Sequence, residues 1–136
     1  MSEEKYNTNL AAEFYVLSIL HRLGANATLT LGNKKSVDIA VVKSAGDTAT
    51  IDVKGLAGTT SWPVDNVKEP KDGHFLVFVC YGGRIAKPDF LPEVWVVPSL
   101  SVEKFVYVSP KGRRVVPRSN LRRAGEEFKG AWSQLA

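Results

Sequence analysis

The first part of the chain has the apolar periodicity of an amphipathic helix. Apolar residues recur over 10–23, Gly24 follows them as a C-terminal stop, and residues 7–9 offer an N-cap. One stripe of this expected helix, with members three or four positions apart, contains Leu10, Glu13, Leu17 and Leu20. Glu13 therefore places a carboxylate in an otherwise apolar face that should pack against the rest of the protein.

Three segments that follow have the length and composition of strands. They span residues 27–31, 37–43 and 48–55, and turn-forming sequences rich in glycine, asparagine and aspartate separate them. We expect them to form an antiparallel meander. Residues 56–73 are polar and contain glycines and prolines, which favours a loop with a short helical turn near residues 65–68.

Two later segments, 74–81 and 93–97, are almost continuously apolar. Strands of this kind are usually covered on both faces, so we expect them at central positions of a sheet. Residues 101–108 favour a short helix, and the apolar residues from Leu121 to Leu135 have the spacing of a longer terminal helix. The whole pattern predicts an α/β fold with a central mixed sheet of about five strands flanked by helices.

Composition narrows the class of protein. The chain has 136 residues, which is room for one domain, and its 44% hydrophobic and 24% charged residues are typical of globular proteins. No segment has the charge and apolar pattern of a signal or the length of a membrane span, so we expect a cytoplasmic protein with no membrane partner. The single cysteine, Cys80, should be a buried core residue, since it falls within an apolar strand.

Candidate chemistry lies on the second and third expected strands. Side chains alternate between the faces of a strand, so Asp52 and Lys54 share one face. Asp38 stands alone in an otherwise apolar strand, where an acid is costly unless it is paired or bound to a metal. A hairpin folded about Gly46 would pair Asp38 with Lys54 and Ala40 with Asp52. The two aspartates would then be diagonal neighbours able to converge on one cation.

Together these residues resemble a known family of nucleases. The succession of Glu13 on a helix, Asp38 on a strand and an Asp-x-Lys sequence at 52–54 is similar to the motif of the PD-(D/E)xK nuclease superfamily. The order of the elements matches through most of the chain, which implies a single restriction-endonuclease-like domain over residues 1–136. Val37 occupies the place of the proline in the family name, a proline that many members also lack.

The resemblance implies an endonuclease that hydrolyses phosphodiester bonds in DNA with the help of a divalent metal. Glu13, Asp38, Asp52 and Lys54 would be its catalytic residues. Asp38 and Asp52 would hold Mg²⁺ or Mn²⁺, with the carbonyl of Val53 as a further ligand and Glu13 contributing directly or through a water. The metal would activate a water and polarise the phosphate, while Lys54 orients that water or stabilises the charge that develops on the phosphate.

Positive charge is concentrated near the C-terminus. Residues 111–123 contain no acid and account for more than the whole formal charge of +4. This segment is either a solvated surface or a strip that contacts phosphates, and its candidate DNA contacts are Lys111, Arg113, Arg114 and Arg118. Trp62, in the polar loop after the Asp-x-Lys sequence, is the candidate for a stacking contact with the substrate.

Three functions remain open on this basis. The leading one is a Mg²⁺-dependent DNA endonuclease that acts as a homodimer or within a larger system, because two-fold enzymes suit two-fold DNA sites. The second is a catalytically inactive domain of the same fold that binds nucleic acid or a protein partner through its basic segment. The third is an RNA or nucleotide hydrolase, since these residues report only metal and phosphate chemistry.

Overall fold

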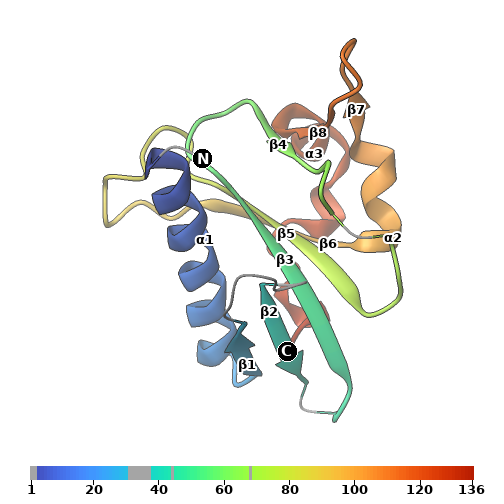
Figure 1. The fold of residues 1–136 in the computed structure, drawn as a ribbon. Helices are drawn as coiled ribbons and strands as arrows, with labels where there is room; N and C mark the ends of the chain where they lie inside the picture. The colour runs from blue at the N-terminus through green and yellow to red at the C-terminus, as the bar shows by residue number, and fades with distance from the viewer. Residues whose placement is uncertain (1–2, 31–37, 44, 68) are drawn as a thin grey trace.

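The main element of the fold is a mixed sheet with strand order β1-β2-β3-β5-β6, seen in a computed structural model that describes residues 3–30, 38–43, 45–67 and 69–136 (Figure 1). The strands β1, β2 and β3 are antiparallel, β5 is parallel to β3, and β6 is antiparallel to β5. The predicted α/β class and the antiparallel meander are confirmed. The bounds are Asn26–Leu29, Ile39–Val42, Thr48–Leu56, His74–Cys80 and Glu93–Pro98.

The first helix, α1, is longer than the sequence pattern predicts. It spans Glu3–Arg22, so residues 7–9 lie inside it and do not cap it. Two acidic residues in its first turn complement the helix dipole and support this earlier start. The helix ends at Arg22, and Gly24 follows as the predicted stop with a φ of +85°, which favours glycine. Its buried residues are Thr8, Ala12, Glu13, Val16 and Leu20.

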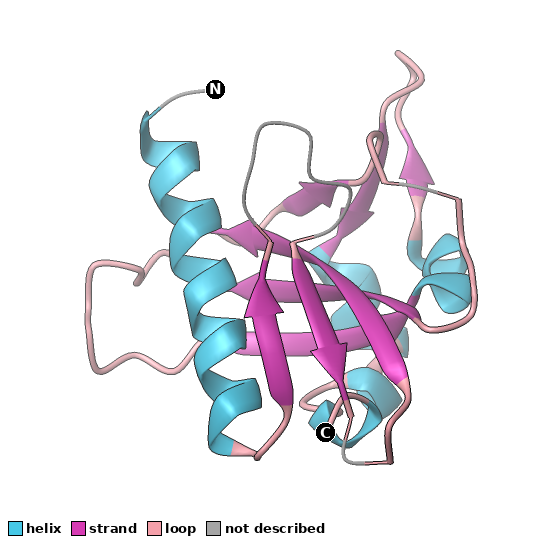
Figure 2. Ribbon diagram, turned by 60° about the horizontal axis from the view of Figure 1, so that its bottom comes forward, coloured by secondary structure: helices cyan, strands magenta, loops and turns pink. Residues whose placement is uncertain are grey.

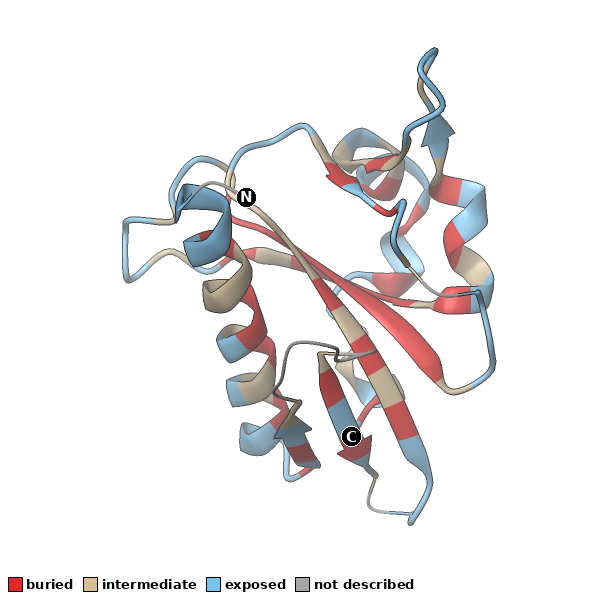
Figure 3. Ribbon diagram, viewed as in Figure 1, coloured by how far each residue is buried: buried red, intermediate tan, exposed pale blue. Residues whose placement is uncertain are grey.

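Hydrophobic layers cover both faces of the main sheet. On one face α1 packs Ala12 and Val16 against Ile51 and Val53 of β3. The second layer packs against the alternate side chains of β5, which include Phe78. Figure 2 shows α1 along one face with the remaining helices beyond the other, and Figure 3 shows burial alternating along β3 but continuous along β5.

The second layer is built on a small sheet that the sequence pattern did not reveal. Its strands β4 (Ser61–Pro63), β8 (Arg114–Pro117) and β7 (Tyr107–Val108) pair antiparallel in that order. The helix α2 (Ser99–Val102) and the 3₁₀ helix η1 (Glu103–Phe105) precede β7. The short helix predicted over 101–108 is thus displaced, because the last residues of that range form a strand.

The long terminal helix predicted toward Leu135 is wrong. The chain instead forms α3 (Arg118–Ala124) and two short 3₁₀ helices, η2 (Glu126–Phe128) and η3 (Trp132–Gln134). Gly130 turns the chain with a φ of +61° and donates its N–H to the carbonyl oxygen of Val94 at 2.8 Å. This segment therefore runs beside β6, which is an edge strand of the main sheet and not a central one.

Two expectations from composition can be compared with the structure. Cys80 is buried in the second layer, as expected. None of the helices within the described ranges has the length and apolar character that a membrane crossing requires.

Gly55 is a point of close contact between β3 and α1. A Cβ at this position would lie 3.0 Å from both the Cβ of Ala12 and the carbonyl oxygen of Thr8, whereas one at Gly58 would meet nothing within 4 Å. We expect Gly55→Val to destabilise the fold by about 1–3 kcal/mol through overpacking. Thermal unfolding measures this, with Gly58→Val as the control. Equal melting temperatures for the two variants would contradict the packing of α1 on β3.

Candidate functional site

Asp38 lies directly beside the Asp-x-Lys segment of β3. The β2–β3 ladder pairs Ile39 with Ile51, so the register predicted from the hairpin is wrong by two residues, although each side chain keeps its expected face within the ladder. Asp38 also donates its N–H to the Ile51 carbonyl oxygen at 2.9 Å. Asp38 and Ile39 thus both lie opposite Ile51, as at a β-bulge. Its carboxylate accepts the N–H of Val53 at 2.7 Å. The bond fixes Asp38 next to Asp52.

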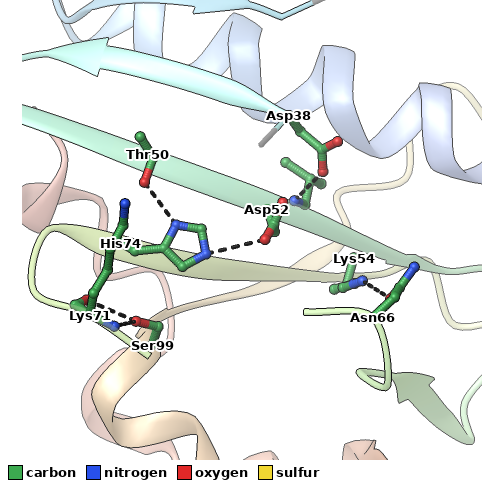
Figure 4. A network of polar contacts seen from close by, with 9 residues as sticks. Asp38, Thr50, Asp52, Lys54, Asn66, Lys71, His74 and Ser99 are labelled. Carbon is green, nitrogen blue, oxygen red and sulfur yellow. Dashed lines mark hydrogen bonds and ion pairs between the residues drawn. The ribbon is translucent and has the colours of Figure 1, made fainter. Parts of the chain in front are cut away.

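Asp52 is held by a buried histidine. Its Oδ2 lies 3.1 Å from Nε2 of His74, and Nδ1 of the same ring lies 2.8 Å from Oγ1 of Thr50 (Figure 4). His74 is 2% exposed and the Asp52 side chain 16% exposed, so this pair is largely shielded from water. The imidazole of His74 on β5 thereby contacts a carboxylate and a hydroxyl of β3, so it links the two strands.

His74 is a site residue that sequence reasoning missed. It opens β5, and the parallel register places it directly beside Thr50 of β3. Parallel pairing joins segments that a crossover separates, so neither periodicity nor a hairpin turn reveals it. The only signal in the sequence was a histidine at the start of an apolar strand.

The two aspartates have different partners. Figure 4 shows Asp52 directed at His74, whereas the Asp38 carboxylate is bound to the backbone of β3. Among the described residues, no three His, Cys, Asp or Glu side chains are grouped as metal ligands. Mg²⁺ commonly uses only one or two protein carboxylates together with substrate phosphates and waters, so Asp38 and Asp52 fit the smaller set.

Lys54 shares a face of β3 with Asp52, as predicted from strand alternation. The parallel register places Asp52 beside Leu76 and Lys54 beside Phe78, both of which belong to the second layer. The Nζ of Lys54 donates to Oδ1 of Asn66 at 3.4 Å (Figure 4). The ammonium group thus lies at the margin of the second layer, where its hydrogen bond to Asn66 is exposed.

Glu13 approaches the sheet from the other side. It is 8% exposed, so the expectation that the helix withdraws it from solvent is confirmed. The helix α1 packs on the face that carries Ile51 and Val53, opposite to the face of Asp52 and Lys54. The Asp38 carboxylate accepts a hydrogen bond from the backbone N–H of Val53, and such N–H groups lie in the plane of a sheet. This carboxylate is therefore placed between the two faces of the sheet.

The basic segment at 111–123 has acidic neighbours in the fold, although it contains no acid itself. Nε of Arg113 lies 2.7 Å from Asp65, and Arg114 pairs with Glu103. Arg118 pairs with Glu93 at 2.9 Å. Lys111 is exposed. The candidate contacts Arg113, Arg114 and Arg118 thus form no unneutralised strip, because distant parts of the chain supply carboxylates.

Trp62 cannot stack on a substrate from the position it occupies. Its side chain is 0% exposed, and Nε1 donates to the carbonyl oxygen of Val79 at 3.2 Å. Its ring packs against those of Phe78 and Trp95. The expectation of a substrate contact is wrong, because the polar loop around Trp62 contains a strand of the small sheet that turns the ring into the second layer.

Glu93 is the most densely paired acid of the basic region. Its carboxylate faces Arg118, Arg122 at 3.9 Å and Lys129 at 3.5 Å. Burial acts to raise the pKa of Glu93, but the hydrogen bond from Arg118 and the three nearby positive charges hold this pKa below its ordinary value.

This lowered pKa predicts a pH-dependent contribution to stability. The contribution is present above the ordinary pKa of a glutamate and is lost as pH falls through the lowered pKa of the folded state. We expect Glu93→Gln to lower the free energy of unfolding by about 1–2 kcal/mol near pH 7 and by less in acid. Melting curves between neutral pH and pH 3 measure this. A deficit that does not depend on pH would contradict the ionic role of Glu93.

The comparisons with known proteins identify no relative. No protein-family model, curated protein or solved structure matches the chain. The fold class therefore stands on the architecture itself. The resemblance to the PD-(D/E)xK superfamily rests on Glu13, Asp38 and the Asp-x-Lys sequence, and what it implies about function is a proposal.

Proposed function

We propose that the protein is a metal-dependent nuclease that hydrolyses phosphodiester bonds in DNA. One observation carries this proposal: the 2.7 Å hydrogen bond from the Val53 amide to Asp38 joins the two separated parts of the acidic motif. The bond brings Asp38 to the segment that contains Asp52 and Lys54. Acids on neighbouring strands with an adjacent lysine are the groups that metal-assisted phosphate chemistry requires.

In this proposal each residue has a separate task. Asp38 and Asp52 would hold Mg²⁺ or Mn²⁺ together with the Val53 carbonyl, and the metal when bound would supply Lewis-acid stabilisation and a more acidic water. Lys54 carries a compact charge on a long stem and would stabilise the developing negative charge of the phosphate. Glu13, on the opposite face, is limited to support through Asp38 or a bound water. We also propose that the protein acts as a homodimer, because a two-fold symmetric enzyme suits two-fold symmetric DNA sites.

A second candidate is a domain that binds nucleic acid but does not cut it. The observation that favours it is the contact between Asp52 and His74, which occupies the carboxylate that the metal would need. A metal can bind Asp52 only if the carboxylate contacts the metal and His74 at the same time, or if it releases His74. The two candidates differ in metal-dependent cleavage and agree in nucleic-acid binding.

Cleavage assays test the proposed activity. Plasmid, single-stranded, branched and RNA substrates are compared with Mg²⁺ or Mn²⁺, and we expect cleavage of at least one of the DNA substrates. We expect Asp52→Asn and Lys54→Ala each to reduce the rate by at least about 100-fold. Asparagine preserves a hydrogen-bond partner for His74, so the variant should fold. Asp89→Asn removes an equal charge from an exposed loop and serves as the control. If the protein cuts none of these substrates, the non-catalytic candidate is favoured.

Metal binding can be tested without a substrate. We expect Mg²⁺ or Ca²⁺ to raise the melting temperature, because a ligand that binds only the folded state stabilises it. Asp38→Asn and Asp52→Asn should each reduce that increase, while Asp89→Asn should leave it intact. Differential scanning calorimetry with and without the cation measures the shift. An unchanged metal response in both site variants would place the cation elsewhere on the protein.

A further inference from the structure

Two hollows in the surface lie beyond the end of β3 and share one lining residue. The first, of about 490 Å³, lies between the start of α1 and residues 55–63, and the second has a volume of about 470 Å³. Thr60 lines both, and the first also contains Glu4 and other residues of α1. The loop from β3 to β4 leads from the N-terminal end of α1 toward α3 (Figure 1). The second hollow, which α3 borders, is here called the α3 groove.

The α3 groove has the chemistry of a phosphate site. Within the described chain its lining combines three guanidinium groups and three hydroxyl groups with no carboxylate, from Thr59, Thr60, Arg118, Ser119, Arg122 and Arg123. Glu93 is a single acid facing three cations, so positive charge remains in excess beside the groove. Arginine, serine and threonine are among the side chains that contact the phosphates of nucleic acids.

Several of these groups are already held in place. Arg118 donates from Nε and Nη2 to Oε1 of Glu93 at 3.2 and 2.9 Å, and its backbone N–H donates to the Thr60 carbonyl oxygen at 2.9 Å. Nη2 of Arg123 donates to Oδ1 of Asn120 at 2.8 Å. Side chains fixed in this way lose less conformational entropy when an anion binds.

We propose that the α3 groove binds the phosphodiester backbone of a nucleic acid. Arg122 and Arg123 are exposed and supply the main charge, while Thr59 supplies a hydroxyl. The site differs from a strip along the whole basic segment, because Arg113 and Arg114 each pair with an acid of their own. Arg118 and Arg122 instead share the single carboxylate of Glu93. The choice of ligand rests on the proposed function, but binding requires neither a metal nor cleavage.

Salt-dependent binding in EDTA tests the groove. Labelled duplex and single-stranded DNA are titrated with the full chain between 50 and 200 mM salt, and retained melting temperatures show that the variants fold. Each phosphate contact contributes about −0.9 to the slope of log affinity against log salt on duplex DNA. Arg122→Ala with Arg123→Ala should flatten this slope by about 1.8, which means that affinity falls about tenfold less over this salt range. Lys111→Ala with Arg113→Ala, which removes the same formal charge, should change the slope far less.

A charge reversal provides an independent variant. Thr59→Glu leaves every arginine in place but introduces an anion into the groove, so it should weaken binding to both forms of DNA. Unchanged binding in Thr59→Glu, an unchanged slope in the Arg122 and Arg123 variant, or displacement of DNA by inorganic phosphate at matched ionic strength would overturn the proposal. Binding through the groove without cleavage under Mg²⁺ would support the groove and contradict only the nuclease activity.

Discussion

The parallel pairing of β3 with β5 is the constraint on which the rest of the structure depends. It joins the antiparallel meander to the most buried strand and thereby creates the two faces that α1 and the small sheet cover. The same register places His74 beside Thr50, from where the imidazole reaches Asp52. A shift of this register would expose one apolar layer and separate the histidine from its partners.

The sequence predicted those features that depend on local periodicity. Both α1 and the shared face of Asp52 and Lys54 follow from spacing along a single element, and the meander follows from short strands separated by turn sequences. The prediction of a long terminal helix was wrong because apolar residues at helical spacing also suit short turns that follow a strand. Gly130 turns the chain in this segment. The role of Trp62 was predicted wrongly and that of His74 was missed, because non-local pairing decides whether a residue in a loop or at a strand end is buried.

The candidate site shows the same division between local and distant information. The sequence indicated that Asp38 belongs near the Asp-x-Lys segment, and the bulge and the Val53 amide bring it there despite a different register. Ion pairs between residues far apart in the chain could not be predicted from the sequence. The segment at 111–123, which contains no acid, was therefore expected to present unneutralised charge. Asp65, Glu93 and Glu103 neutralise much of it.

The central claim is that a divalent cation binds where Asp38 meets the Asp-x-Lys segment. Paramagnetic broadening of amide signals by substoichiometric Mn²⁺ tests it most directly, because the effect falls steeply with distance from the ion and needs no substrate. We expect the earliest losses at Asp38, Asp52, Val53 and Lys54, with reversal by excess Mg²⁺ and abolition in Asp38→Asn. Broadening centred on another surface, or none at these four residues, would contradict the account.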